Sequence, residues 1–249
     1  MIKYIKYIIN IRIYIVYIVL GGVNMPSWKI HSKIASDLSK QLNVNKKYFM
    51  IGNLLPDQDK YNIPNLERSI NRTITHFISE DDLKIGKNLP DYNRMYEKYR
   101  GRFKNPILLG YLVHLLTDFY WNNYIYKNYF LKSDEKYISL KTNKGEIIRC
   151  EFAQANSIKQ SDFKKYNNSL FVKKYNFRFC LNNSFFKEID ELKLSKKDIY
   201  MVGRHLNSSH LKINDNSEYQ ILNELELNKL LEDSKKFILN YLKDQQIIK

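Results

Sequence analysis

Cysteine is scarce in this chain, which has only Cys150 and Cys180 among its 249 residues. Two cysteines form at most one bridge, and this pair lacks the spacing of a metal-binding motif, so a secreted disulfide framework is not indicated. Glycine (8) and proline (5) are also few. The sequence also lacks internal repeats and low-complexity linkers, which indicates a single domain.

Two further absences narrow the function. No histidine is followed directly by an aspartate, which disfavours the metal phosphohydrolases built on an adjacent His-Asp pair. Acidic residues are too few to balance the basic ones, and the formal net charge is +15. That excess favours anionic partners such as nucleic acid, acidic lipid surfaces or phosphate-bearing substrates. Most of the basic residues are scattered lysines, which a solvated surface explains.

Residues 1–24 combine a basic start with an apolar run from Ile13 to Leu20, which is too short for a membrane span. The sequence Gly21-Gly22-Val23-Asn24-Met25 back-translates to a purine-rich element followed by a start codon, as at a bacterial ribosome-binding site. We therefore expect translation to start at Met25 and the protein to be cytoplasmic. The alternative is a genuine signal segment, which would make the protein secreted or membrane-associated. The expected domains are a leader, 1–24, and one helical domain, 25–249.

Apolar residues recur at helical spacing through most of this domain. The pattern predicts helices beginning after Ser27 and over 48–51, 91–100, 106–130, 196–206 and 222–242. Residues 136–170 differ, because their apolar residues alternate on either side of a turn signal at 143–145. The predicted fold is therefore an all-α multi-helix bundle with a small β-hairpin or irregular insertion around 136–170.

Several polar residues interrupt the apolar segments. His114 and Asp118 stand four apart on one helix face, where they must satisfy each other or share a cation. His31, Asp57 and His76 are also flanked by apolar residues. Each alone has a simple explanation, such as a core histidine bonded to a backbone carbonyl or an aspartate in a Pro-Asp turn. Together, three histidines and two carboxylates suit zinc or a similar divalent ion.

Four short segments, in this order, resemble the zinc-dependent phospholipase C family over about residues 25–125. They are Trp28-x-x-His31, Leu55-Pro56-Asp57, Thr75-His76-Phe77 and His114-x-x-x-Asp118. That family shares its all-helical fold with the fungal single-strand nucleases. The resemblance implies one zinc ion held by Asp57, His76, His114 and Asp118, and a second held by His31 with Asp118 as the bridge.

Two parts of the family pattern are missing. Family enzymes also hold the second ion through an N-terminal tryptophan, but the matching Trp28 is internal and its nitrogen is an amide. The third ion of the family requires a His-x-x-x-Glu helix after the His-x-x-x-Asp helix, and this chain has none. We therefore expect one or two zinc ions.

The resemblance implies a zinc-dependent hydrolase of phosphoester bonds, of the phospholipase C type, that uses metal-activated water. Asp57 is the expected catalytic residue, which would orient or deprotonate that water. The expected partner is an anionic phosphoester, of which phospholipid is the best-known example in the family, and we expect a monomer. Two alternatives stay open: a nuclease-type phosphodiesterase with aromatic side chains that stack bases, and a non-catalytic helical domain with a structural metal.

Overall fold

A computed structural model describes residues 26–57, 71–81, 89–132, 137–172, 197, 200–201, 204 and 217–249. The expected leader and most of the helix expected at 196–206 lie outside these ranges. The described part is mostly helical with one small antiparallel sheet, as the sequence predicted. Within it, no helix is both long and apolar enough to cross a membrane.

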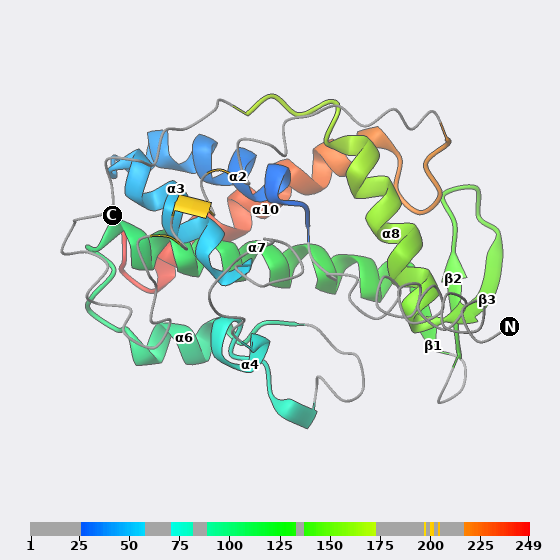
Figure 1. Ribbon diagram of the computed structural model, residues 1–249, viewed down its shortest axis with the longest axis horizontal. Coiled ribbons are helices and arrows are strands. Elements are labelled where there is room, and N and C mark those ends of the chain that lie inside the picture. The colour runs from blue at the N-terminus through cyan, green and yellow to red at the C-terminus, as the bar shows by residue number, and fades with distance from the viewer. Residues whose placement is uncertain are drawn as a thin grey trace, which may run out of the picture.

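The longest helix, α7 (Pro106–Asn128), is the centre of the bundle. Asn105 caps it by accepting a hydrogen bond from the backbone N–H of Ile107, and Pro106 suits the first turn. Its residues are buried nearly all round over the first 13 positions, 106–118, as expected of a core helix. In Figure 1, other helices lie along both sides of α7. They are α2 (Trp28–Gln41), α3 (Lys46–Leu54), α4 (Arg72–Thr75), α6 (Tyr92–Lys98) and α10 (Glu224–Asp244).

Two glycines allow α3 and α7 to pack backbone against backbone. A Cβ atom on Gly52 would lie 2.0 Å from the carbonyl oxygen of Ile107. A Cβ atom on Gly110 would lie 2.1 Å from the carbonyl oxygen of Phe49. Real Cβ atoms cannot come that close to another atom, so only glycine fits at either position. This close crossing brings the end of α3 beside the middle of α7.

The helices at the two ends of the described chain begin where their capping residues predict. The Ser27 hydroxyl accepts from the N–H of Ile30 at the start of α2. Asn223 and Glu226 form a reciprocal capping box at the start of α10. The predicted stripe of α2 is buried, with His31 fully inside it. The predicted amphipathic C-terminal helix is confirmed as α10, which packs on α7.

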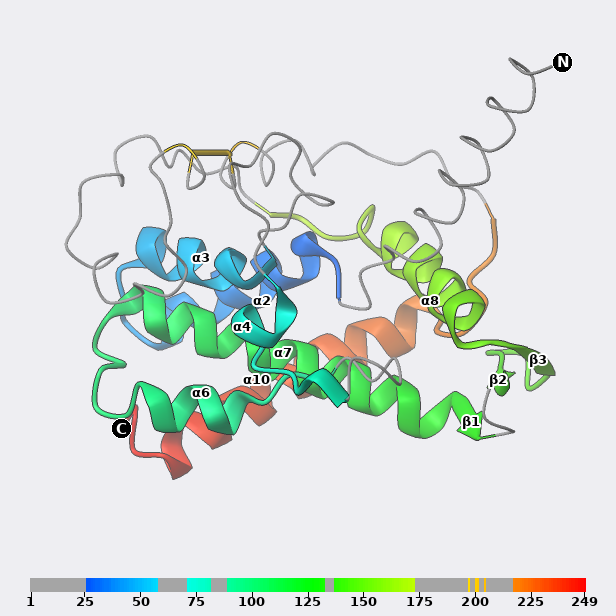
Figure 2. The same ribbon diagram turned by 60° about the horizontal axis from the view of Figure 1, so that its bottom comes forward.

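The predicted hairpin in the range 136–170 is part of a three-stranded sheet and is followed by a helix. Strands β1 (Phe130–Lys132), β2 (Tyr137–Lys141) and β3 (Ile147–Glu151) form an antiparallel sheet in that order. A helix that the sequence pattern did not indicate, α8 (Phe152–Tyr166), follows β3 directly. Figures 1 and 2 both show α8 and the sheet at one end of the bundle. The Asp162 carboxylate accepts backbone hydrogen bonds at 220–222, which ties α8 to the chain before α10.

Candidate metal centre

Asp57 is the last residue of a short 3-10 helix, Leu55–Asp57, which continues directly from α3. Pro56 cannot extend α3 with a regular hydrogen bond, so the helix tightens at this point. The tighter turn directs the Asp57 side chain inward. Asp57 is only 2% exposed, unlike an ordinary aspartate in a surface turn.

His76 caps the C-terminus of the four-residue helix α4. The next residue, Phe77, has a backbone φ of 56°, in the left-handed region that bulky residues rarely adopt. The chain therefore turns sharply just after His76. His76 is buried, with 1% of its surface exposed, and it faces α7.

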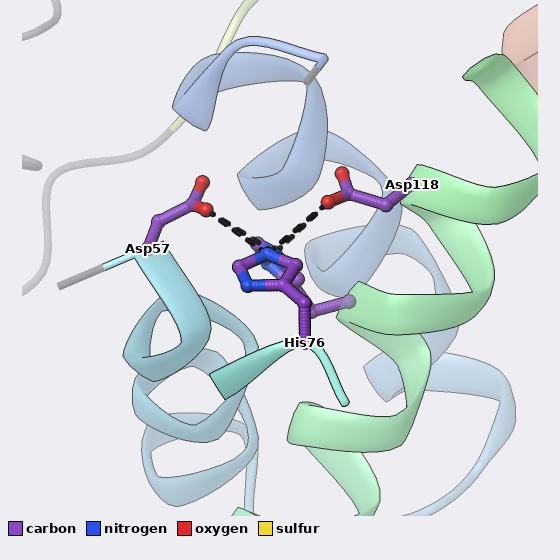
Figure 3. Close-up of side chains that lie close together, drawn as sticks. Asp57, His76 and Asp118 are labelled. Atoms are coloured by element: carbon purple, nitrogen blue, oxygen red, sulfur yellow. Dashed lines mark hydrogen bonds and ion pairs between the residues drawn. The ribbon is translucent and has the colours of Figure 1, made fainter. Parts of the chain in front are cut away.

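His114 and Asp118 project from the same face of α7, one turn apart, and both are fully buried. Figure 3 shows the His76 ring between the carboxylates of Asp57 and Asp118. These four side chains, from three separate segments, each direct one ligand atom to a common point. Those atoms all lie within 4.8 Å of one another.

The distances between the four candidate ligand atoms distinguish a metal site from a hydrogen-bonded cluster. His76 Nε2 lies 3.4 Å from Asp57 Oδ1 and 3.3 Å from Asp118 Oδ2. His114 Nε2 lies 3.5 Å from Asp57 Oδ1 and 3.6 Å from Asp118 Oδ2. The two Nε2 atoms are 3.4 Å apart.

These five distances match five of the six edges expected of a metal-centred tetrahedron. Zinc bonds of about 2.0–2.2 Å place tetrahedral ligand atoms about 3.3–3.6 Å apart. Hydrogen bonds between the same kinds of atom would be shorter, about 2.7–3.2 Å. The carboxylate of Asp118 is fully buried, and the imidazoles of His76 and His114 approach its Oδ2 at these longer distances. The residues present therefore fit a divalent cation better than a hydrogen-bonded cluster.

Neighbouring groups orient both imidazoles for this role. His114 Nδ1 lies 2.7 Å from the carbonyl oxygen of Asn53, which can only accept, so Nδ1 carries the proton. His76 Nδ1 lies 2.8 Å from Thr75 Oγ1. The Tyr111 hydroxyl in turn donates to the Thr75 carbonyl. The Asn53 carbonyl therefore leaves Nε2 of a neutral His114 ring with its lone pair toward the common point, and a Thr75 hydroxyl that accepts from His76 Nδ1 does the same for His76.

His31 lies beside this group but is not one of the four. Its Nε2 is 2.9 Å from Asp118 Oδ1, whereas His76 and His114 approach the other oxygen, Oδ2. The two oxygens of Asp118 therefore face two different sets of imidazoles. The 2.9 Å contact has the length of a hydrogen bond, so a second ion bridged by Asp118 stays a prediction from the family resemblance.

The charges of the cluster set its proton-binding state. Burial by itself would lower the pKa of His114, but the Asp57 and Asp118 carboxylates outweigh it and raise that pKa to about 10. Burial likewise disfavours the charge on both carboxylates, yet His114 and the other imidazoles hold the pKa of each below its ordinary value. Without metal, a protonated His114 therefore balances part of the carboxylate charge.

Sequence patterns missed the groups that support the cluster. Asn53 and Thr75 contribute a backbone carbonyl and a hydroxyl next to His114 and His76. Thr75 directly precedes His76 and could have been noticed from its position. Lys159 is fully buried on α8, and nothing in the sequence distinguishes it from the many surface lysines.

Comparison with known proteins agrees with this geometry. The sequence profile of the family described as zinc-dependent phospholipase C matches residues 28–199, which is more than half of the chain and extends past the segments that carry the resemblance. No curated protein and no solved structure matches the chain. The chain belongs to the zinc-dependent phospholipase C family.

Proposed function

We propose that the protein is a zinc-dependent hydrolase of phosphodiester bonds, and that phospholipids are its first substrate class. The observation that carries the proposal is the set of five distances of 3.3–3.6 Å among the ligand atoms of Asp57, His76, His114 and Asp118. Family membership supports zinc as the ion. The positive net charge of +15 suits an anionic substrate.

In this proposal the four residues hold one zinc ion, while His31 and the second oxygen of Asp118 contribute to another. A zinc ion with these four protein ligands would bind water only by expanding to five-coordinate. It would then lower the pKa of that water to about 7 and offset charge on phosphoryl oxygens. Asp57 approaches both imidazoles through Oδ1, so we assign to its Oδ2 the orientation of the attacking water. The buried imidazoles and α7 would keep bulk water away from the reacting phosphorus.

The test compares zinc-loaded and chelator-treated protein on bis(p-nitrophenyl) phosphate. Chelation should abolish hydrolysis and zinc should restore it. Asp57→Asn should reduce kcat by about 100-fold or more, because it weakens both ligation and the orientation of water. The matched control is Asp91→Asn, which alters a surface helix cap on α6 and should leave kcat unchanged. Full activity in Asp57→Asn would place the chemistry elsewhere.

A substrate panel then separates the remaining possibilities. Phosphatidylcholine vesicles should be hydrolysed in preference to single-stranded DNA if the lipid assignment is right. The opposite preference would identify a nuclease-type enzyme on the same site. Zinc that raises the melting temperature without hydrolysis of any phosphodiester would reduce the site to a structural role.

A further inference from the structure

The polar face of α7 continues beyond the metal cluster. Asn122 and Tyr126 follow Asp118 at successive four-residue steps, so they lie on the same side of the helix. Asn122 is fully buried, and the hydroxyl oxygen of Tyr126 is buried as well. Polar groups in such positions require partners.

A buried lysine reaches this face from α8. Lys159 is fully buried, and its Nζ donates to Asn122 Oδ1 over 3.1 Å. The same ammonium lies 5.1 Å from the centre of the Tyr126 ring. Burying an ammonium in a protein core is costly unless nearby negative charge compensates it.

Arg72 completes a group of neighbours around Asp118. Its Nη2 lies 3.9 Å from Asp118 Oδ2. Burial lowers the pKa of Lys159 to about 7, and the charges of Asp118 and Arg72 also act on it. Burial raises the pKa of the Tyr126 hydroxyl, and the charges of Asp118 and Arg72 act on this group too. The metal cluster and a second group, formed by Lys159, Arg72, Asn122 and Tyr126, therefore meet at Asp118.

Two buried polar atoms of this second group could bond a ligand. Asn122 Nδ2 and the Tyr126 hydroxyl are buried, and neither has a hydrogen-bond partner among the described residues. Lys159 and Arg72 bring basic side chains to the same group, where both interact with the charge of Asp118. If Asp118 ligates zinc, less of its negative charge acts on these two side chains.

We propose that Lys159, Arg72, Asn122 and Tyr126 form a subsite that binds a phosphoryl group beside the metal cluster. This proposal depends on the proposed function only for the identity of the substrate, because phosphate binding can be measured without hydrolysis. A phosphoryl group carries several acceptor oxygens and a negative charge, so it can bond several donors at once. A phosphodiester substrate and inorganic phosphate share this chemistry.

Phosphate binding tests the subsite without any need for turnover. Isothermal titration of inorganic phosphate into zinc-loaded protein should show Lys159→Met binding about 10–100-fold more weakly, the usual worth of a charge-assisted hydrogen bond. Zinc content should stay unchanged. The melting temperature should stay level or rise, because methionine removes a buried charge at similar volume.

The matched control is Lys165→Met on the same helix. Lys165 is also buried, but it donates to the carbonyl oxygen of Glu218, away from Asp118. This variant should lose stability while keeping wild-type phosphate affinity. Tyr126→Phe is a second, gentler probe, since it removes only the hydroxyl, and it should weaken phosphate binding several-fold. It decides the question alone if Lys159→Met does not fold.

Kinetics separate this proposal from the proposed function. In an active enzyme, Lys159→Met should raise KM for the diester, the inhibition constant of phosphate, or both, and so identify the bound species. If Lys159→Met and Tyr126→Phe keep wild-type phosphate affinity and KM, the subsite is wrong although hydrolysis stands. If the wild type binds phosphate through Lys159 but hydrolyses no diester, the subsite stands and the proposed function fails.

Discussion

The rings of His31 and His114 stack face to face in the core, with centroids 4.0 Å apart and planes 9° from parallel. Two stacked imidazoles cannot both carry a charge without strong repulsion. Burial opposes charge on both, but Asp57 and Asp118 outweigh it at His114 and raise its pKa to about 10. Burial and the neighbouring His114 lower the pKa of His31. His31 is therefore neutral, the state in which an imidazole can ligate a metal.

The neutral His31 leads to a prediction about zinc content. His31→Phe preserves an aromatic ring against His114 but removes both ring nitrogens. We expect zinc content to fall from two ions to one and kcat to fall about 100-fold, because the second ion would no longer offset phosphoryl charge. Elemental analysis and phosphodiester kinetics measure the two effects. His31→Gln, which returns a ligand oxygen, should recover part of the zinc, whereas two ions in His31→Phe would contradict a role for His31.

The raised pKa of His114 predicts that zinc affinity depends on pH. In metal-free protein His114 is protonated below about pH 10, and a metal can bind only after that proton leaves. Zinc binding must therefore release a proton, and affinity should increase about tenfold per pH unit between pH 7 and pH 8.5. Calorimetry in buffers of different ionisation enthalpy counts the released protons. An affinity that is flat over this range would show that His114 is already neutral.

The hydroxyl of Thr75 predicts a supporting role at His76. Thr75→Val keeps the shape of the side chain but removes the partner of His76 Nδ1. Loss of such a partner typically weakens metal affinity about 10–100-fold. Thr117→Val is the matched control, because the Thr117 hydroxyl is also buried but donates to the carbonyl of Val113. Equal zinc affinities in the two variants would leave no role for the Thr75 hydroxyl.

The sequence predicted most of the helices because their signals are local. The cap at Ser27, the first-turn proline Pro106 and the apolar periodicity of α2 and α10 do not depend on distant residues. Helix α8 lacked such a signal. Its buried positions include Asn156, Lys159 and Asp162, so its core-facing side is too polar to show as an apolar stripe. Its burial depends on partners such as Asn122 on α7.

The candidate ligands could be predicted for a different reason. Each of the five polar residues stands within an apolar segment, and their order along the chain resembles a known family. Their distances could not be predicted, because those depend on how closely α3 approaches α7. The subsite around Lys159 could not be predicted either, because nothing in the local sequence distinguishes a buried lysine from the rest of the 41 basic residues.

The close crossing of α3 and α7 gives the last prediction. Gly→Ala within a helix usually stabilises it by about 1 kcal/mol. Gly52→Ala should instead destabilise zinc-free protein by at least about 2 kcal/mol, because the new Cβ would meet Ile107 O at 2.0 Å and force the helices apart. Moving the two helices apart would also lengthen the hydrogen bond between His114 Nδ1 and the Asn53 carbonyl oxygen. Zinc affinity should therefore fall as well.

Urea unfolding and zinc titration of the same variant measure both effects of Gly52→Ala. The control is Gly101→Ala, where an added Cβ meets nothing within 4 Å but φ is 78°. Its cost should come from the left-handed backbone alone, about 1–2 kcal/mol, with zinc affinity unchanged. If Gly52→Ala lost stability but bound zinc as tightly as Gly101→Ala, the helix crossing would hold the fold together without positioning His114.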